Sequence, residues 1–325
     1  MRAGLMFPGQ GSHRPGMGRP WAGRPGWDLV GRAAEITGRD VAALLLDADE
    51  PTLRRTENTQ LATFVLELVI LAELTGLGTD TGTGPVTPVA CAGHSLGEFT
   101  ALVAAGVLSI DDGIRLVHAR GTAMREAAAA EPGAMSAVLG LDQDEVEDVA
   151  AGLRADGARV WAANLNAPGN VVVSGTPDGV ARCGEEAVRR GALRVVGLPV
   201  GGAFHTPLMA PALGPLEAVL ETAVFADGHA PVVANVDAEP HGGGPDWRGR
   251  LLRQLTGPVQ WSRTVPVLTE RLGCDLLLEV GPGRTLTGLA KRLAPRAVRA
   301  DIGEPDRIAD VVLRADLVAG RAPAR

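Results

Sequence analysis

Tyrosine is absent from this chain of 325 residues, and lysine occurs only once, at Lys291. The absence of tyrosine excludes acid–base chemistry that depends on a phenol. Lys291 lies in a Gly-Leu-Ala-Lys-Arg segment that does not match the phosphate-binding P-loop, and no feature around it indicates a Schiff base. The paired glycines at 9 and 11, 82 and 84, and 281 and 283 lack the third glycine of a dinucleotide-binding loop. Nucleotide-binding and Schiff-base classes are therefore disfavoured.

Cysteine is also scarce. Cys91, Cys183 and Cys274 are odd in number and far apart, which argues against a disulfide framework and favours a reducing cytoplasm. Cys91 and His94 have the spacing of metal ligands, but no second pair completes a set of four. We therefore predict no metal site.

No apolar run is long and uncharged enough to span a bilayer, because the stretch 61–74 carries Glu67 and Glu73. Pro8 and Gln10 precede any apolar run of signal-peptide length. Acidic residues outnumber basic ones by 38 to 31, so the net charge of −7 excludes a general polyanion binder. We expect a cytoplasmic protein that binds neither membranes nor nucleic acid.

Apolar strand-like runs alternate with helical patterns, which predicts an α/β fold. From Met135 to Pro199 the order becomes β-α-β-β-α-β, as in a ferredoxin-like unit. The prediction is a large α/β-hydrolase-like domain with a parallel sheet, residues 1–131 and 200–325, and an inserted small ferredoxin-like subdomain, residues 132–199. The Gly- and Thr-rich segment Gly76–Thr87 is predicted to be a surface loop, and the tail 319–325 to be frayed.

The strongest local pattern is Gly93-His94-Ser95-Leu96-Gly97, a G-x-S-x-G sequence between an apolar strand and a helix. A nucleophilic serine in so tight a turn needs small neighbours two residues before and after it, and both are glycine. The free N–H groups of the following helix could bind an oxyanion. The alternative is an ordinary strand–turn–helix corner, since the pattern also arises by chance.

A serine needs a base to become nucleophilic, and six histidines are available. His205 follows a strand in a turn of small residues, which favours it over the others. His94 belongs to the Gly93–Gly97 turn, which we call the elbow, and it is expected to point away from the Ser95 hydroxyl. His118 lies within a predicted helix, and a surface or packing role is the better interpretation there. Position alone does not decide among them.

Six motifs in order resemble the malonyl-CoA:acyl carrier protein transacylase family of fatty-acid and polyketide synthesis, from about Leu5 to Leu293. They are Phe7-Pro8-Gly9-Gln10-Gly11-Ser12, Gly93-His94-Ser95-Leu96-Gly97-Glu98, Asn164-x-Asn166-x-Pro168-Gly169, Ala203-Phe204-His205-Thr206-Pro207-Leu208-Met209, Gln254-Leu255-Thr256-x-Pro258-Val259-x-Trp261 and Glu279-Val280-Gly281-Pro282-Gly283.

The resemblance implies a Ser–His dyad. Ser95 would attack the acyl-CoA thioester, and His205 would take its proton. A backbone carbonyl at Gln254 would orient the imidazole in place of a carboxylate. The backbone N–H groups of Gln10 and Leu96 would form the oxyanion hole.

The resemblance also implies substrate contacts. Arg120 would pair with the free carboxylate of the acyl group, a task that suits the planar fork of a guanidinium. Phe204 and Asn164 would line the pocket, and Phe204 together with Leu96 favours malonyl over methylmalonyl. The sequence departs from the usual family pattern at His13 and at the pair 201–202, where Gly-Gly replaces Ser-Gly.

The resemblance therefore predicts an acyltransferase that moves malonyl from coenzyme A to the phosphopantetheine thiol of an acyl carrier protein, with no bound cofactor. Two alternatives keep the same dyad, namely a hydrolase that edits acyl carrier proteins and a shuttle that moves acyl groups between carriers. A non-catalytic docking subunit would require the dyad to be vestigial. A monomer is expected. Six arginines are candidates for docking the acidic carrier: Arg189, Arg190, Arg194, Arg284, Arg292 and Arg296.

Overall fold

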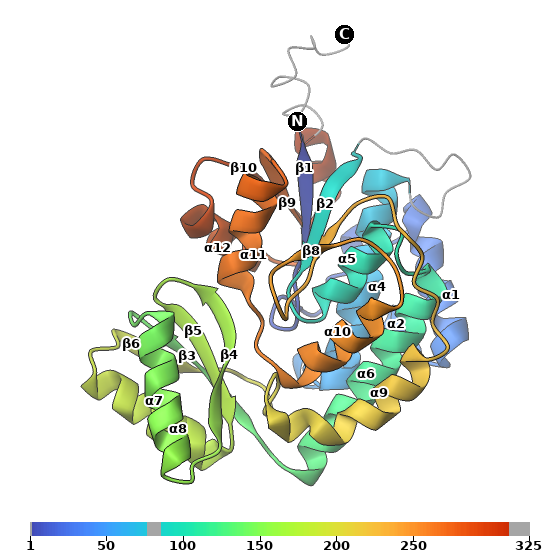
Figure 1. Cartoon of the computed structure of the whole chain (residues 1–325). Helices are drawn as coiled ribbons and strands as arrows, with labels where there is room; N and C mark the ends of the chain where they lie inside the picture. The colour runs from blue at the N-terminus through green and yellow to red at the C-terminus, as the bar shows by residue number, and fades with distance from the viewer. Residues whose placement is uncertain (1, 77–85, 312–325) are drawn as a thin grey trace.

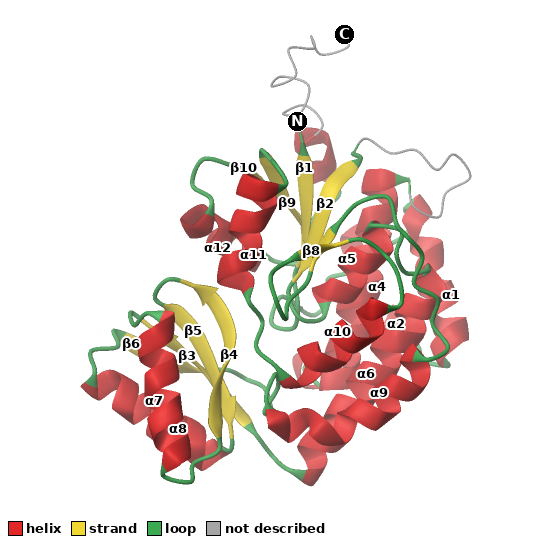
Figure 2. Ribbon diagram, in the orientation of Figure 1, coloured by secondary structure: helices red, strands yellow, loops and turns green. Residues whose placement is uncertain are grey.

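The computed structural model describes residues 2–76 and 86–311 and contains two β-sheets, one of six strands and one of four (Figure 1, Figure 2). The loop predicted at Gly76–Thr87 falls almost entirely outside the described residues, as does the tail 319–325.

The larger sheet runs in the order β10-β9-β1-β2-β7-β8. All its neighbouring pairs are parallel except β7 and β8, which are antiparallel. The predicted parallel sheet is confirmed, and the short antiparallel edge is an addition that two-residue strands are too short to reveal as a sequence pattern. The strands are β1 (Ala3–Phe7), β2 (Pro88–Gly93), β7 (Val232–Val233), β8 (Pro240–His241), β9 (Leu276–Val280) and β10 (Val298–Ile302).

The central strands β1, β2 and β9 are buried on both faces of this sheet, which explains why they read as nearly continuous apolar runs. In β1, Leu5 and Phe7 pack into one core and Met6 into another on the opposite face. The first face is covered by α4 (Thr56–Thr75), α5 (Gly97–Ala104) and α6 (Ile110–Ala130), and the second by α11 (Trp261–Pro266), a π-helical turn (Val267–Arg271) and α12 (Thr285–Leu293).

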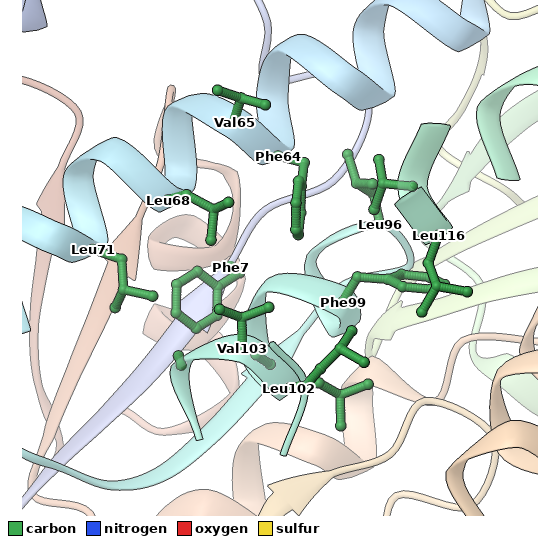
Figure 3. Packing of buried hydrophobic residues seen from close by; sticks show 14 of the residues in the cluster. Phe7, Phe64, Val65, Leu68, Leu71, Leu96, Phe99, Leu102, Val103 and Leu116 are labelled. Carbon is green, nitrogen blue, oxygen red and sulfur yellow. The ribbon is translucent and has the colours of Figure 1, made fainter. Parts of the chain in front are cut away.

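Contrary to the expectation drawn from Glu67 and Glu73, the central helix α4 is long and apolar enough to cross a membrane by length and composition alone, but 89% of that stretch is buried inside the protein. Figure 3 shows Phe64, Leu68 and Leu71 of this helix pointing toward Phe7 of β1 and Val103 of α5. An apolar helix that is buried all round is the core helix of a large domain.

The smaller sheet is antiparallel in the order β4-β5-β3-β6, and we call residues 134–197 the small unit and the other described residues the large unit. Two helices bury Val146, Val149 and Val180 against one face of the sheet. Met135 and Val172, on the other face, belong to the core of the large unit. The elements are β3 (Ala134–Leu139), α7 (Gln143–Ala155), β4 (Val160–Ala167), β5 (Asn170–Gly175), α8 (Pro177–Arg189) and β6 (Arg194–Gly197).

The two connections of the small unit run side by side, because Gly133 N–H donates to the carbonyl of Gly201 at 3.3 Å. A second link joins β4 to the segment before α11, where Leu165 N–H donates to the carbonyl of Val259 at 2.9 Å. Figure 1 shows the small unit, in green, beside α11 and below α12.

The remaining helices belong to the large unit. The helical structure of residues 14–27 is limited to two 3₁₀ turns, Arg19–Trp21 and Pro25–Trp27. A 3₁₀ turn begins at Pro207, and the α-helix that follows it ends at Leu220. These elements are α1 (Asp28–Thr37), α2 (Val41–Leu46), α3 (Glu50–Leu53), a 3₁₀ turn (Pro207–Ala212), α9 (Leu213–Leu220) and α10 (Asp246–Thr256).

Candidate active site

Ser95 lies in the tight turn between β2 and α5 with φ of 54°, in the left-handed region that few side chains adopt. The two flanking glycines make this turn possible. A Cβ on Gly93 would lie 1.9 Å from the backbone of Gly97, and a Cβ on Gly97 would lie 2.1 Å from the carbonyl oxygen of Phe7. The steric requirement inferred from the sequence is therefore present in the backbone.

The loop after β1 packs directly against this turn. His94 N–H donates to the carbonyl of Phe7 at 2.9 Å, and a Cβ on Gly9 would come within 2.6 Å of the carbonyl oxygen of His94. This contact places Gln10 beside Ser95 and Leu96 in the same cavity. Within the described ranges, the backbone N–H groups of Gln10 and Leu96 have no hydrogen-bond partner. They are available to an anionic oxygen.

The N–H of Ser95 itself is already occupied, because it donates to Asn235 Oδ1 at 2.7 Å. The side-chain amide of Asn235 donates in turn to the carbonyl of Gly93 at 2.6 Å. Asn235 thus ties both ends of the turn together, and it removes the Ser95 N–H from the donors that could serve an oxyanion.

His205 lies within hydrogen-bond distance of the Ser95 hydroxyl, with 2.7 Å between Oγ and Nε2. Its other nitrogen, Nδ1, lies 2.8 Å from the carbonyl oxygen of Gln254. Because a carbonyl only accepts, Nδ1 carries the proton and Nε2 is free to accept one from Ser95. His205 also has a left-handed backbone, with φ of 61°. Both members of the pair are held in strained conformations.

Burial, together with the neighbouring Arg120, lowers the pKa of His205 to about 3. The imidazole is therefore neutral at physiological pH, which is the state that a general base requires.

The other described histidines lie away from the hydroxyl. His94 Nε2 hydrogen-bonds to Asn166 Oδ1 at 2.9 Å, and its ring packs against Trp261. His118 is half-buried on α6, and His241 pairs with Asp237 at 3.0 Å. Of the histidines in the described residues, only His205 is hydrogen-bonded to Ser95.

Arg120 reaches the same hydroxyl from α6 and is only 1% exposed. Its Nη2 donates to Ser95 Oγ at 3.1 Å and to Gln254 Oε1 at 3.0 Å, while Nη1 donates to Gln60 Oε1 at 2.6 Å. All three acceptors are neutral groups, and Nε has no hydrogen-bond partner in the described part of the chain. Burial lowers the pKa of Arg120 to about 10, so the side chain remains a cation at neutral pH.

These side chains line one cavity. The polar side of the cavity is made by Gln10, Gln60, His94, Ser95, Arg120, Asn164 and His205. The apolar side is made by Leu96, Met124, Met135, Leu198, Val200 and Phe204. All of the sequence-predicted site residues contribute to this lining except Gln254, which lies behind His205 and Arg120.

Two of the predicted pocket residues are placed by local irregularities. Asn164 follows a break in the register between β4 and β5, and such a bulge turns a side chain toward a site. Its Oδ1 is buried without a hydrogen-bond partner among the described residues. The ring of Phe204 packs over Gly202, where a Cβ would lie 2.3 Å from a ring carbon. The glycine at 202 is thus required by the position of Phe204.

The comparisons with known proteins show the family of the chain. A model of the acyl transferase domain matches residues 5–241. The malonyl CoA-acyl carrier protein transacylase of Bacillus subtilis is 36% identical over 310 residues, covering 94% of each chain. That of Escherichia coli is 37% identical over 309 residues, covering 94% of this chain and 97% of its own. The chain belongs to the malonyl-CoA:acyl carrier protein transacylase family.

A solved member of this transacylase family is similar along its whole length. It is a malonyl-transacylase in complex with an acyl carrier protein of a type II polyketide synthase, and it superimposes with a TM-score of 0.90 at 35% identity. The superposition covers 97% of this chain and 100% of that one.

Sequence reasoning missed three groups of the site: Gln60, which lines the cavity, and the side chains of Asn235 and Gln254, which hydrogen-bond to Ser95 and Arg120 from behind it. Gln60 lies in an apolar helical run, where it reads as an isolated exception. Asn235 follows β7 after one intervening residue, and the carboxyl ends of parallel strands are where α/β proteins place functional groups. That signal was present in the sequence. The contacts of the Gln254 side chain depend on tertiary packing alone.

Proposed function

We propose that this protein transfers malonyl from coenzyme A to the phosphopantetheine thiol of an acyl carrier protein through a malonyl ester on Ser95. The observation that carries the proposal is the buried guanidinium of Arg120, whose hydrogen-bond acceptors among the described residues are all neutral and which opens into the cavity beside the Ser95–His205 pair. A buried cation without an anionic partner is costly, and a carboxylate on the substrate would offset that cost.

In the first half-reaction, Ser95 Oγ attacks the thioester carbon while its proton passes to His205 Nε2. The carbonyl of Gln254 holds the imidazole, and the N–H groups of Gln10 and Leu96 stabilise the oxyanion of the tetrahedral intermediate. Collapse of that intermediate expels the thiol of coenzyme A, which takes the proton from His205. In the second half-reaction, the carrier's thiol gives its proton to His205 and attacks the ester, and Ser95 recovers the proton on leaving.

Arg120 has two effects on the choice of acyl group. Its guanidinium can bind the distal carboxylate through two hydrogen bonds. Its positive charge also lowers the pKa of His205, and a carboxylate placed on it would relieve part of that effect. The ring of Phe204 leaves less room on the apolar wall for a methyl branch, which favours malonyl over methylmalonyl by about 1–3 kcal/mol. The unpartnered Asn164 Oδ1 can accept a hydrogen bond from an amide N–H of the pantetheine arm.

The structure divides the six candidate docking arginines into two groups. Arg189 and Arg190 both pair with Glu186, and Arg284 pairs with Asp301. In the described ranges no ion pair involves the other three, which are Arg194, Arg292 and Arg296.

Of these three, Arg292 is the best placed to dock an acidic carrier protein. Its Nη2 lies 3.7 Å from the Cβ position of Gly169, in the turn between β4 and β5. The same turn follows Asn166, the hydrogen-bond partner of His94 in the elbow. An acyl carrier protein bound at Arg292 would therefore lie beside the cavity.

We further propose that residues 132–199 are an inserted ferredoxin-like subdomain on an α/β-hydrolase-like domain of residues 1–131 and 200–325. The paired crossing at Gly133 and Gly201 supports these boundaries. The antiparallel order β4-β5-β3-β6 with two helices on one face supports the ferredoxin-like description. We propose that the protein acts in the cytoplasm as a monomer.

The test of the proposed function is intact-mass measurement after exposure to malonyl-CoA, followed by addition of holo acyl carrier protein. We expect one malonyl adduct on the wild type, none on Ser95→Ala, and transfer to the carrier faster than hydrolysis. Ser174→Ala is the matched control, because this buried serine lies in the small unit and its hydroxyl has no partner among the described residues. Release of free malonate without transfer would favour the editing hydrolase instead.

A further inference from the structure

Two oppositely charged side chains are buried beside the nucleophile without touching each other. Glu98 on α5 and Arg120 on α6 are each 1% exposed. The side-chain amide of Gln254 lies between them and bonds to both. Its Oε1 accepts from Arg120 Nη2 at 3.0 Å, and its Nε2 donates to Glu98 Oε2 at 2.8 Å.

This arrangement fixes which way the Gln254 amide faces. A guanidinium only donates, so the amide oxygen of Gln254 must face Arg120 and the amide nitrogen must face Glu98. The second N–H of Gln254 Nε2 donates to the carbonyl of Ser95, with 2.7 Å between the nitrogen and the oxygen. The amide that orients the guanidinium is therefore also tied to the backbone of the nucleophile.

Glu98 is itself held by a donor that cannot rotate. Its Oε1 accepts the backbone N–H of Asn235 at 2.6 Å, in the loop after β7. The side chain of Asn235 is bonded to Ser95 N–H and to the carbonyl of Gly93. Burial raises the pKa of Glu98 to about 7, while the donated hydrogen bonds and the charge of Arg120 act in the opposite direction.

We propose that Glu98 is a positioning residue for carboxylate recognition: through the Gln254 amide it orients the guanidinium of Arg120 toward the acyl group bound at Ser95. The inference rests on the proposed function, since it concerns the binding of the malonyl carboxylate. Neither oxygen of Glu98 contacts the cavity directly, so its effect passes through Gln254 to Arg120.

The variant Glu98→Gln tests this with little change of shape. A carboxamide at 98 has one acceptor and one donor, whereas the site presents two donors. The backbone N–H of Asn235 is fixed, so the new amide oxygen must face it and the new NH₂ must face Gln254. The Gln254 amide can rotate, and it would then present its own NH₂ to Arg120. The guanidinium loses its acceptor and meets a donor.

We expect Glu98→Gln to lower kcat/KM for malonyl-CoA by about 10- to 100-fold, since a hydrogen bond to a charged group contributes about 1.5–3 kcal/mol. The readout is the ratio of malonyl to acetyl transfer, because acetyl has no carboxylate to place. This ratio should fall about tenfold or more. In an Arg120→Gln background the same change should leave the ratio unaltered, because the group it positions is gone.

Glu67→Gln is the matched control. Glu67 is another fully buried glutamate, on α4, and it hydrogen-bonds to Thr100 rather than to Gln254 or Arg120. Burial raises its pKa well above the ordinary value, so a neutral amide is a close substitute for it. We expect the malonyl-to-acetyl transfer ratio of Glu67→Gln to match that of the wild type.

If Glu98→Gln does not fold, as judged by circular dichroism, Gln254→Met replaces it. This variant keeps the backbone carbonyl that holds His205 and removes only the amide, and it should lower the same ratio. A malonyl-to-acetyl ratio equal to that of the wild type in either folded variant would overturn the proposal, even if both activities fell together. Failure of the wild type to load malonyl would instead refute the proposed function, so the two failures are distinguishable.

Discussion

The two units of the molecule differ in what they bury. The large unit buries charged and polar side chains around the nucleophile, among them Glu98, Arg120, Asn235 and Gln254. The small unit buries valines, alanines and leucines, and Ser174 is its only buried polar residue. Each unpaired buried polar group costs about 1–3 kcal/mol, so a polar network persists only where its members satisfy one another.

This difference separates two tasks within one cavity. The large unit supplies the nucleophile, the base and the cation. The small unit and its return connection supply half of the six apolar wall residues, Met135, Leu198 and Val200, and the small unit also supplies the polar Asn164. Replacement of groups in the polar network should therefore change chemistry, whereas replacement at the wall should change shape and stability.

The largest effect is expected from loss of the base. His205→Ala should slow formation of the acyl-enzyme by about 10⁴-fold or more, because the Ser95 hydroxyl then has no acceptor for its proton. Rapid-quench measurement of malonyl labelling would show this. His118→Ala, on α6, is the control and should keep the wild-type rate. Equal losses in the two variants would contradict the assignment of the base.

Loss of the cation should rank second. Arg120→Gln should lower kcat/KM for malonyl-CoA by about 10²- to 10³-fold, since removing one partner of a buried charge pair costs about 2–5 kcal/mol. Acetyl transfer should fall far less, because acetyl carries no carboxylate. The control is Arg115→Gln, a half-exposed arginine of the same helix paired with Asp112. Undiminished malonyl transfer in Arg120→Gln would show that the carboxylate binds elsewhere.

A smaller effect is expected where the chain returns from the small unit. Gly202→Ala places a Cβ 2.3 Å from the ring of Phe204, and overpacking of this kind costs about 1–3 kcal/mol. Displacement of the ring should also change the preference between malonyl-CoA and methylmalonyl-CoA. Gly201→Ala is the neighbouring control, because nothing lies within 4 Å of its Cβ position. Urea unfolding and competition between the two substrates measure both effects.

The smallest effect concerns stability against pH. The unfolded His205 titrates near 6.5, and in the folded protein its pKa is lowered to about 3. Between these values the unfolded state binds a proton that the folded state does not, so stability falls as pH drops below 6.5, by about 1 kcal/mol per pH unit. The small unit has no histidine, so titration of histidine affects the stability of the large unit alone.

The corresponding measurement is urea unfolding from pH 7 to pH 5. His205→Gln should show a shallower decline than the wild type over this range. Identical slopes would mean that the imidazole is not desolvated as the structure indicates.

Much of this site could be predicted because its requirements are local. The turn at Ser95 needs glycines at 93 and 97, and the serine and both glycines lie within five consecutive residues. The alternation of Leu5, Met6 and Phe7 between two cores makes β1 a continuous apolar run, which marks a strand buried on both faces. The resemblance then brought distant motifs together, and the structure places Ser95, His205 and Arg120 on one cavity.

The sequence by itself determined the strand–turn–helix at Ser95, the parallel sheet and the order of the motifs, because steric limits and hydrophobic periodicity act over a few residues. Only the tertiary structure decided that Gln254 joins Glu98 to Arg120, that Asn235 occupies the N–H of Ser95, and that His205 is the histidine within reach. Those contacts join residues more than a hundred positions apart. Hydrogen bonds between groups so distant leave no period or spacing in a single sequence.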